Sequence, residues 1–288
     1  MKVAAAAYPP TPLTAWAEFD AKAAAWVEDA VGQGARLLVF PEYGAMELAH
    51  LDGPAAADLE AALHASARHA PRAQETWARL ARAHDCYILA PTGPWSGPDR
   101  PTNRAHLHGP SGPLGHQDKQ VMTRFERSWN VAPAAHAIRL FDVDGWRAAI
   151  LTCYDAEFPV LAPHEADLLL VPSCTDARAG WTRVHVGARA RALELQCPAI
   201  HAPTVGDAPW CPAIDENRGA AAVYGPPDIG FPEDGILAQG GHDAPGWTLA
   251  TLDRAAVARV RADGHVLNRL HAAEAARAAA RTCQAGDS

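Results

Sequence analysis

Three polar residues of the sequence each stand at the end of an expected strand. Glu42 ends "LLVFPE", Lys119 ends "LGHQDK" and Cys153 ends "AAILTC". Taken singly, Glu42 is equally typical of a solvated loop, Lys119 of a surface hairpin, and Cys153 of a small buried hydrophobe. In layered α/β proteins, however, functional groups collect at the carboxyl ends of strands. The joint pattern therefore predicts one site that contains all three.

These three residue types could catalyse acyl transfer without histidine. A thiol with the usual pKa of about 8.5 is mostly protonated at neutral pH, and the thiolate is the attacking form. A carboxylate such as Glu42 can take that proton as a general base. An ammonium such as Lys119 stabilises both the thiolate and the oxyanion of a tetrahedral intermediate. The backbone N–H of Tyr154, directly after Cys153, is the expected second oxyanion donor, and Asp155 is expected to shape the turn.

The elements that would position this site begin as alternating strands and helices. A helix is expected after Thr14 as N-cap, ending at Gly32 or Gly34. A second helical stretch covers 54–84 and is expected to be interrupted at Pro71. Continuous apolar runs, typical of strands covered on both faces, predict strands at 2–8, 35–41 and 86–92. This order predicts parallel pairing through crossover helices.

The middle of the chain predicts hairpins, and the rest returns to strands around one helix. Residues 104–119 and 136–152 are expected as hairpins, with 120–135 as a loop between them. A helix is expected over 181–196, and a pair of strands around a Pro/Gly loop over 220–240. Further strands are expected at 166–173, 198–205 and 246–253. The economical organisation is one α/β domain over 1–270, followed by a helical or frayed tail over 271–288.

Composition narrows the class of protein. The chain has 288 residues, of which 49% are hydrophobic and 20% charged, so it can bury a large core. A net charge of −8 without any basic run argues against a nucleic-acid partner. No apolar stretch is long enough to cross a membrane, and Pro9 and Pro10 break the N-terminal apolar run, so no signal peptide is expected. Six cysteines without a CxxC pair are expected as reduced thiols of a cytoplasmic protein.

Other chemistry-bearing residues favour structural interpretations. The histidines show no HExxH or paired spacing, so neither a metal site nor a cofactor is expected. Trp181 and Cys174 follow the strand that ends at Ser173 and could line the site, but core packing is the favoured interpretation for both.

The motifs "VFPE" and "CYDxxFP", with a lysine after a hairpin between them, resemble the nitrilase, or carbon–nitrogen hydrolase, superfamily. The similarity continues through "ADLLLVPS", "ARARALELQCPAI" and "AAAVYGPPDIGFPEDGIL", so it covers most of residues 1 to about 270. The resemblance implies a four-layer α-β-β-α sandwich that associates as a homodimer or larger homo-oligomer. It also implies Glu42 as base, Lys119 as oxyanion lysine and Cys153 as nucleophile.

A second glutamate that positions substrate is also implied, and Glu126 matches it in rough position. Glu47 is the alternative carboxylate, for which a helical or surface position is expected. Two departures concern the substrate rather than the mechanism. Glu157 stands where many members have arginine, and "QVMTRFERSWN" replaces the usual stretch after the lysine.

The resemblance implies a hydrolase that cleaves a carbon–nitrogen bond other than a peptide bond, in a small amide or N-carbamoyl substrate, through a cysteine thioester. The same three residues would serve an amine-accepting acyl transferase or a nitrilase. A non-catalytic binding protein of the same fold is the third alternative, but such a protein would be expected to have lost one of the three.

Overall fold

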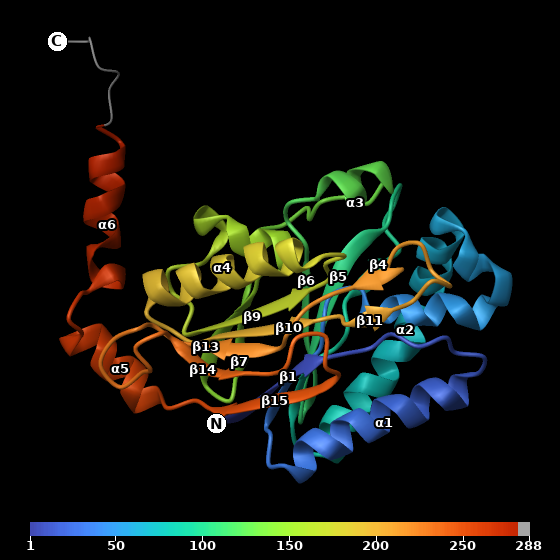
Figure 1. Ribbon diagram of the computed structural model, residues 1–288, viewed down its shortest axis with the longest axis horizontal. Helices are drawn as coiled ribbons and strands as arrows, with labels where there is room; N and C mark the ends of the chain where they lie inside the picture. Colours follow the sequence, from blue (N-terminus) through green and yellow to red (C-terminus); the bar gives the residue numbers. More distant parts are fainter. Residues whose placement is uncertain (282–288) are drawn as a thin grey trace.

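Two β-sheets pack face to face at the centre of the molecule, and helices cover their outer surfaces (Figure 1). The computed structural model describes residues 1–281. This arrangement is the four-layer α-β-β-α sandwich expected from the sequence.

The first sheet has seven strands in the order β15-β1-β2-β3-β5-β4, with β6 paired to β5. Strands β1, β2 and β3 run parallel, as the alternation of strand and helix predicts, and the remaining pairs are antiparallel. The strands are β1 (Lys2–Ala7), β2 (Leu37–Val39), β3 (Tyr87–Leu89), β4 (Gly93–Trp95), β5 (Thr102–Gly109), β6 (Gly112–Asp118) and β15 (Gly246–Thr251).

The second sheet has six strands in the order β14-β13-β10-β9-β8-β7. Strands β8, β9 and β10 are its parallel centre, flanked by antiparallel pairs. The strands are β7 (Leu140–Val143), β8 (Trp146–Ile150), β9 (Leu168–Ser173), β10 (Ala199–Pro203), β13 (Ala222–Tyr224) and β14 (Ile236–Gln239). A separate short pair joins β11 (Gly206–Asp207) to β12 (Glu216–Asn217).

Helices cover each sheet on one side only. The first sheet is covered by α1 (Trp16–Gly32) and α2 (Leu59–Ala83), and the second by α4 (Arg178–Leu195). Helices α5 (Arg254–Asp263) and α6 (Asn268–Ala279) follow the last strand, and α6 projects from the sandwich (Figure 1). The short helices are α3 (Arg124–Ser128) and the 3-10 helices η1 (Gly44–Ala57), η2 (Cys153–Glu157) and η3 (Pro159–Leu161).

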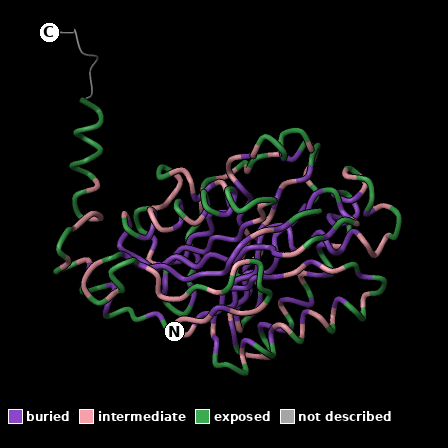
Figure 2. The backbone as a smooth tube through the Cα atoms, viewed as in Figure 1, coloured by how far each residue is buried: buried purple, intermediate pink, exposed green. Residues whose placement is uncertain are grey.

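The core occupies three layers because the central strands are apolar on both faces. On β1, Val3 and Ala5 point between the two sheets, whereas Ala4 and Ala6 point toward α1 and α2. Buried chain runs through the middle of the molecule in Figure 2. Burial on both faces explains why these strands have continuous apolar runs instead of an alternating pattern.

Several expected boundaries are wrong. Helix α1 begins at Trp16 with Ala15 as N-cap, and Thr14 instead donates to the carboxylate of Glu18. Pro71 does not interrupt α2. A proline inside a helix costs about 3 kcal/mol, but tertiary packing of a buried helix face can exceed that cost, and α2 buries a long face that includes Trp77.

Other segments have elements that the sequence analysis did not include. The expected loop over 120–135 contains α3, and α5 has no sequence-based counterpart. The expected tail over 271–288 is helical within α6, and its part from residue 282 onward lies outside the described residues. The five cysteines of residues 1–281 are free thiols, and no helix in this range is long and apolar enough to span a bilayer.

Candidate active site

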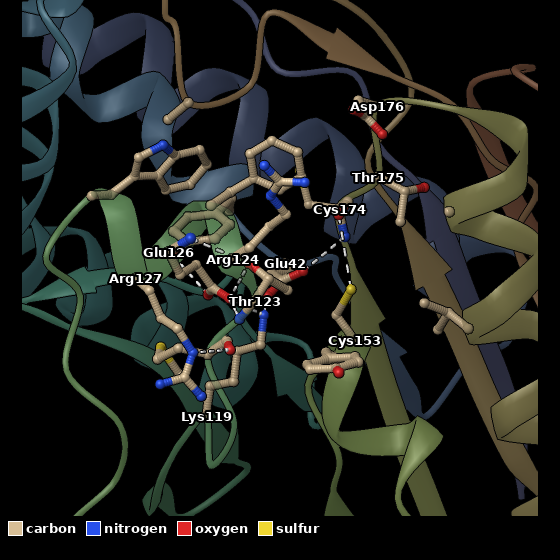
Figure 3. A pocket seen from close by; sticks show the side chains of 18 of the residues that line it. Glu42, Lys119, Thr123, Arg124, Glu126, Arg127, Cys153, Cys174, Thr175 and Asp176 are labelled. Atoms are coloured by element: carbon tan, nitrogen blue, oxygen red, sulfur yellow. Dashed lines mark hydrogen bonds and ion pairs between the residues drawn. The ribbon is translucent and has the colours of Figure 1, made fainter.

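The three residues predicted from strand ends meet in one cavity of about 870 Å³. Glu42 follows β2 and Lys119 follows β6, both in the first sheet, whereas Cys153 follows β8 in the second sheet. In Figure 3, Cys153 faces Glu42, Lys119 and Glu126 across this cavity. The cavity therefore lies where the strand ends of the two sheets converge.

Lys119 lies at the centre of a buried cluster of charges. Its Nζ donates hydrogen bonds to Glu42 Oε1 at 2.8 Å and to Glu126 Oε2 at 2.6 Å. All three side chains are at most 2% exposed. A buried charge without a partner is strongly destabilising, so this cluster depends on all its members. Glu126, the substrate-positioning residue implied by the resemblance, thus lies beside the predicted base.

Two further side chains hold the carboxylates, and neither was predicted. Asn103 on β5 donates through Nδ2 to Glu42 Oε1 at 2.9 Å and to Glu126 Oε1 at 3.3 Å. The hydroxyl of Tyr43 donates to Glu126 Oε1 at 3.0 Å. Asn103 is itself oriented because its Oδ1 accepts a hydrogen bond from Thr92 Oγ1 at 2.7 Å. Hydrogen bonds to both carboxylates favour their charged forms and fix their directions.

Helix α3 brings Glu126 to the site through a capping box. Thr123 Oγ1 accepts a hydrogen bond from the Glu126 N–H, and Glu126 Oε2 accepts one from the Thr123 N–H. The sequence "TRFE" carries this signature, a threonine followed three residues later by a glutamate. That signature could have revealed the helix in the expected loop.

Cys153 has a backbone conformation that few side chains adopt. Its φ is 52°, in the left-handed region, where a non-glycine residue is strained. It is the first residue of η2, so the N–H of Tyr154 is among those with no acceptor inside the helix. Gly187 of α4 lets η2 approach closely, since a Cβ there would lie 2.8 Å from Ala156 O. The turn that carries Cys153 is therefore held by packing.

Asp155 connects the turn that carries Cys153 to the segment that carries Lys119. Its buried carboxylate accepts hydrogen bonds from the N–H of Gln120, at 3.0 Å to Oδ2, and of Val121, at 2.8 Å to Oδ1. From the sequence, Asp155 was expected only to shape the turn. Its contacts instead set the position of Lys119 relative to the thiol.

Cys174, at the end of β9, makes a second connection between the sheets. Its N–H donates to Glu42 Oε2 at 2.9 Å, and its carbonyl oxygen lies 3.8 Å from Cys153 Sγ. Its side chain lines the cavity, and its Sγ donates to Asn217 Oδ1 at 3.3 Å. The expectation of a simply packed thiol is therefore incomplete for Cys174. Trp181 does belong to the core, where its Nε1 donates to Ala220 O at 3.0 Å.

Burial and neighbouring charges set different pKa values for the two glutamates. Burial raises the pKa of Glu42 to about 7; Lys119 opposes the rise and Glu126 adds to it. Burial also disfavours the charge of Glu126, but the ammonium of Lys119 and hydrogen bonds from Thr123 outweigh it and lower its pKa. Glu126 therefore stays ionised, while Glu42 can take up a proton near neutral pH.

The thiol and the lysine keep their protons at rest. Burial and the charge of Glu42 raise the pKa of Cys153 well above its usual value. Although burial opposes the charge of Lys119, both carboxylates raise its pKa well above the usual range. A protonated thiol beside a carboxylate that titrates near neutral pH is suited to proton transfer during attack.

Two other glutamates singled out in the sequence, Glu47 and Glu157, differ in their relation to the cavity. Glu47 lies in the helix η1, one of the two expected positions, but it is buried, and it accepts hydrogen bonds from Tyr8 Oη at 2.7 Å and Lys22 Nζ at 2.6 Å. Tyr8 lies on the outer side of the first sheet, and neither it nor Lys22 nor Glu47 lines the cavity. Glu47 therefore does not replace Glu126 as the second carboxylate of the site. Glu157 lines the cavity, as its place in "CYDAEFP" suggested.

The sequence profile of the carbon-nitrogen hydrolase family matches residues 2–262, which are nearly all the residues that the structure describes. The chain belongs to the carbon–nitrogen hydrolase family. Among curated proteins, the "Probable hydrolase YhcX" of Bacillus subtilis is 33% identical over 168 residues, which are 57% of this chain and 33% of that protein. The "Hydrolase in pqqF 5'region" of Pseudomonas protegens is 33% identical over 127 residues, 43% of this chain and 40% of that protein. The chain thus matches less than half of the length of these two relatives.

Solved structures of the nitrilase superfamily share the fold of this carbon–nitrogen hydrolase. Saccharomyces cerevisiae Nit3, a member of branch 10, superposes with a TM-score of 0.70 at 19% identity, covering 91% of this chain and 93% of that one. The NitN amidase from Nesterenkonia sp. AN1 gives 0.68 at 22% identity, covering 96% and 99%. A carbon–nitrogen hydrolase from Helicobacter pylori G27 gives 0.72 at 14% identity, covering 91% of each chain.

Proposed function

We propose that this carbon–nitrogen hydrolase cleaves a small amide or N-carbamoyl compound through a thioester on Cys153. The observation that carries the proposal is the buried cluster of Glu42, Lys119 and Glu126 facing Cys153 across one cavity. It combines a nucleophile, a carboxylate that titrates near neutral pH and a permanent cation, a set that can carry out acyl transfer.

In the first half of the reaction, Glu42 takes the proton of Cys153 as sulfur attacks the carbonyl carbon. The oxyanion that forms is stabilised by the Lys119 ammonium and the N–H of Tyr154. Glu42 then returns the proton to the departing nitrogen, the C–N bond breaks, and ammonia or an amine leaves. Glu126 stays ionised and orients the substrate, since its charge and direction are fixed by Lys119, Asn103 and Tyr43.

In the second half, Glu42 takes a proton from water, and the hydroxide attacks the thioester carbon. The C–S bond breaks, the acid leaves, and the proton returns to Cys153. In a mutant of the Nesterenkonia amidase, acrylamide has undergone Michael addition at the active-site cysteine, so the cysteine of that protein is reactive.

The test is a panel of amides, N-carbamoyl compounds and nitriles, measured by ammonia release and by mass spectrometry of the protein. We expect turnover of an amide or N-carbamoyl compound and an acyl adduct on Cys153. Glu42→Gln should slow formation of this adduct by roughly 10²–10⁴, the usual contribution of a positioned base.

The control is Cys197→Ala, which removes another buried free thiol outside the cavity. It should keep activity, whereas Cys153→Ala should lose it. Turnover that survives in Cys153→Ala would refute the thioester route. Release of an N-substituted amide only when an amine is added would favour the acyl-transferase alternative, and turnover of nitriles alone would favour a nitrilase.

A further inference from the structure

Outside the catalytic cavity, the outer part of the first sheet carries a row of imidazoles. His106 on β5 pairs across strands with His116 on β6, and their ring centroids are 5.8 Å apart. The ring of His136, from the segment before β7, lies 5.8 Å from that of His116. Asp118 shares the face of β6 with His116 because it is two residues further along the strand. Two imidazoles and a carboxylate therefore meet at one place.

We propose that His116, Asp118 and His136 bind a divalent transition-metal ion of the Zn²⁺ class. One ligand atom from each of the three lies within 4.8 Å of the other two. Zinc–nitrogen and zinc–oxygen bonds are about 2.0–2.2 Å long, so small side-chain rotations would close this triangle around an ion. His116 and His136 are half-buried, which leaves a route for the ion and for a water ligand.

A second observation points to a ligand at this place. His136 Nε2 is buried and has no hydrogen-bond partner among residues 1–281, and it lies 3.7 Å from Asp118 Oδ2. Buried polar atoms nearly always have a hydrogen-bond partner. The distance from His136 Nε2 to Asp118 Oδ2 is within ion-pair range but longer than a hydrogen bond, so it leaves room for a ligand between the two atoms. An ion bound between them would supply the missing partner of His136.

The donor set selects the class of metal. Imidazole nitrogens suit zinc, copper and nickel, whereas calcium and magnesium prefer oxygen ligands throughout. Arg104 donates to both oxygens of Asp118, at 2.6 and 2.9 Å, and thereby orients the carboxylate as a partner of a metal ligand would. The charge of Arg104 also opposes a cation, so we expect weaker binding than at a structural site of four cysteines.

The site spans both ends of the segment that carries two predicted active-site residues. Asp118 directly precedes Lys119, and the carbonyl of His136 accepts a hydrogen bond from Gln120 Nε2 at 3.0 Å. Between these ends lies α3 with Glu126. A metal at this position would fasten the ends of the segment without entering the cavity, so it would stabilise the fold and take no part in the chemistry. No metal site was expected from the sequence, because the histidines show no HExxH or paired spacing. His136 comes from a different element than His116 and Asp118, so their proximity has no local signal.

The test is a competition between the purified, metal-free protein and a chromophoric zinc chelator, combined with the melting temperature measured with and without ZnCl₂. We expect one zinc per chain and a Tm that rises by a few degrees, because a ligand that binds only the folded state stabilises it. His136→Gln should weaken zinc binding by more than about tenfold, since loss of even a second-shell partner commonly has that effect.

The matched control is His64→Gln, which removes an exposed histidine on α2 and should leave binding unchanged. His116→Gln is the second ligand variant, in case His136→Gln disturbs the fold. Cys153→Ala should keep the zinc, because the proposed site does not use the thiol. The proposal is overturned if wild-type protein takes no zinc from the chelator, if both histidine variants bind like wild type, or if Cys153→Ala removes the bound zinc.

Discussion

Replacement of Glu126 by glutamine should move the pH dependence of Cys153 reactivity to lower pH. The charge of Glu126 raises the pKa of Glu42, whereas Lys119 lowers it. Glu126→Gln removes the negative charge and leaves Lys119 with Glu42 as its one remaining anionic partner in the cluster. Both changes favour the ionised form of Glu42, so its pKa should fall. The base then stays available in more acidic solution.

The size of this shift follows from the geometry of the cluster. Carboxylate oxygens of Glu42 and Glu126 each bond to the same Nζ, at 2.8 and 2.6 Å, so the two charges lie close together. Two like charges roughly 5 Å apart repel by about 3 kcal/mol at an effective dielectric constant of 20, which corresponds to roughly 2 pKa units. The dipole of the new glutamine side chain still repels part of the Glu42 charge. We therefore expect the pKa of Glu42 to fall by about one to two units from its starting value of about 7.

The assay is the rate of Cys153 alkylation by iodoacetamide, followed by mass spectrometry over a series of pH values. It needs no knowledge of the natural substrate. Tyr43→Phe is the matched control, because it removes a hydrogen bond to Glu126 Oε1 and leaves every charge in place. In Tyr43→Phe, the pH at which the alkylation rate falls in acidic solution should move much less. In Glu42→Gln, the rate should show no such fall. The reasoning would be refuted if, in Glu126→Gln, the alkylation rate falls in acid at the same pH as in the wild type or at a higher pH.

Three other changes test the surroundings of the site. Asn103→Leu removes a hydrogen bond to the ionised form of Glu42, so the loss of Cys153 alkylation in acid should move to higher pH, opposite to Glu126→Gln; a downward move would contradict this role. Asp155→Ala leaves the N–H groups of Gln120 and Val121 without an acceptor and should lower the free energy of unfolding by about 2–5 kcal/mol, measured with urea. Asp155→Asn should lose much less, because an amide oxygen can replace Oδ1, and equal losses would contradict the hydrogen-bond account. Light scattering should show a homodimer or larger oligomer, and a monomer at all concentrations would exclude it.

The parts of the site that the sequence predicted are those with a local signal. Glu42, Lys119 and Cys153 each end an expected strand, and strand ends can be located from the pattern of apolar residues. The order of elements does not by itself bring the three together, because Glu42 and Lys119 follow strands of the first sheet and Cys153 follows a strand of the second. Their convergence was predicted from the joint pattern of residue types and from the resemblance to the family. The alternation of apolar strand patterns and helix patterns predicted an α/β domain, whereas the four-layer sandwich was implied by the resemblance to the family.

The missing parts have no local signal or a weak one. Asn103 is the second residue of β5, and its partners lie after β2 and in α3, so only the folded chain shows that it bridges two glutamates. Glu47 was expected in a helix or at the surface, and it lies in η1; its burial has no local signal because its partners Tyr8 and Lys22 are distant in the sequence. Helix α3 is only five residues long, too short for a periodic pattern to appear.

The candidate catalytic groups are divided between the two sheets. The packing of the core between the sheets therefore sets the distance between these groups. Glu42 and Lys119 are attached to the first sheet, whereas Cys153 is attached to the second. Side chains such as Val39 and Leu170 fill the space between the two sheets. A displacement of about 1 Å between reacting groups can cost 10²-fold in rate. Substitutions that let one sheet slide over the other should therefore impair turnover while the protein remains folded. In a library of random variants, inactive but folded proteins should carry changes at this buried interface as well as around the cavity.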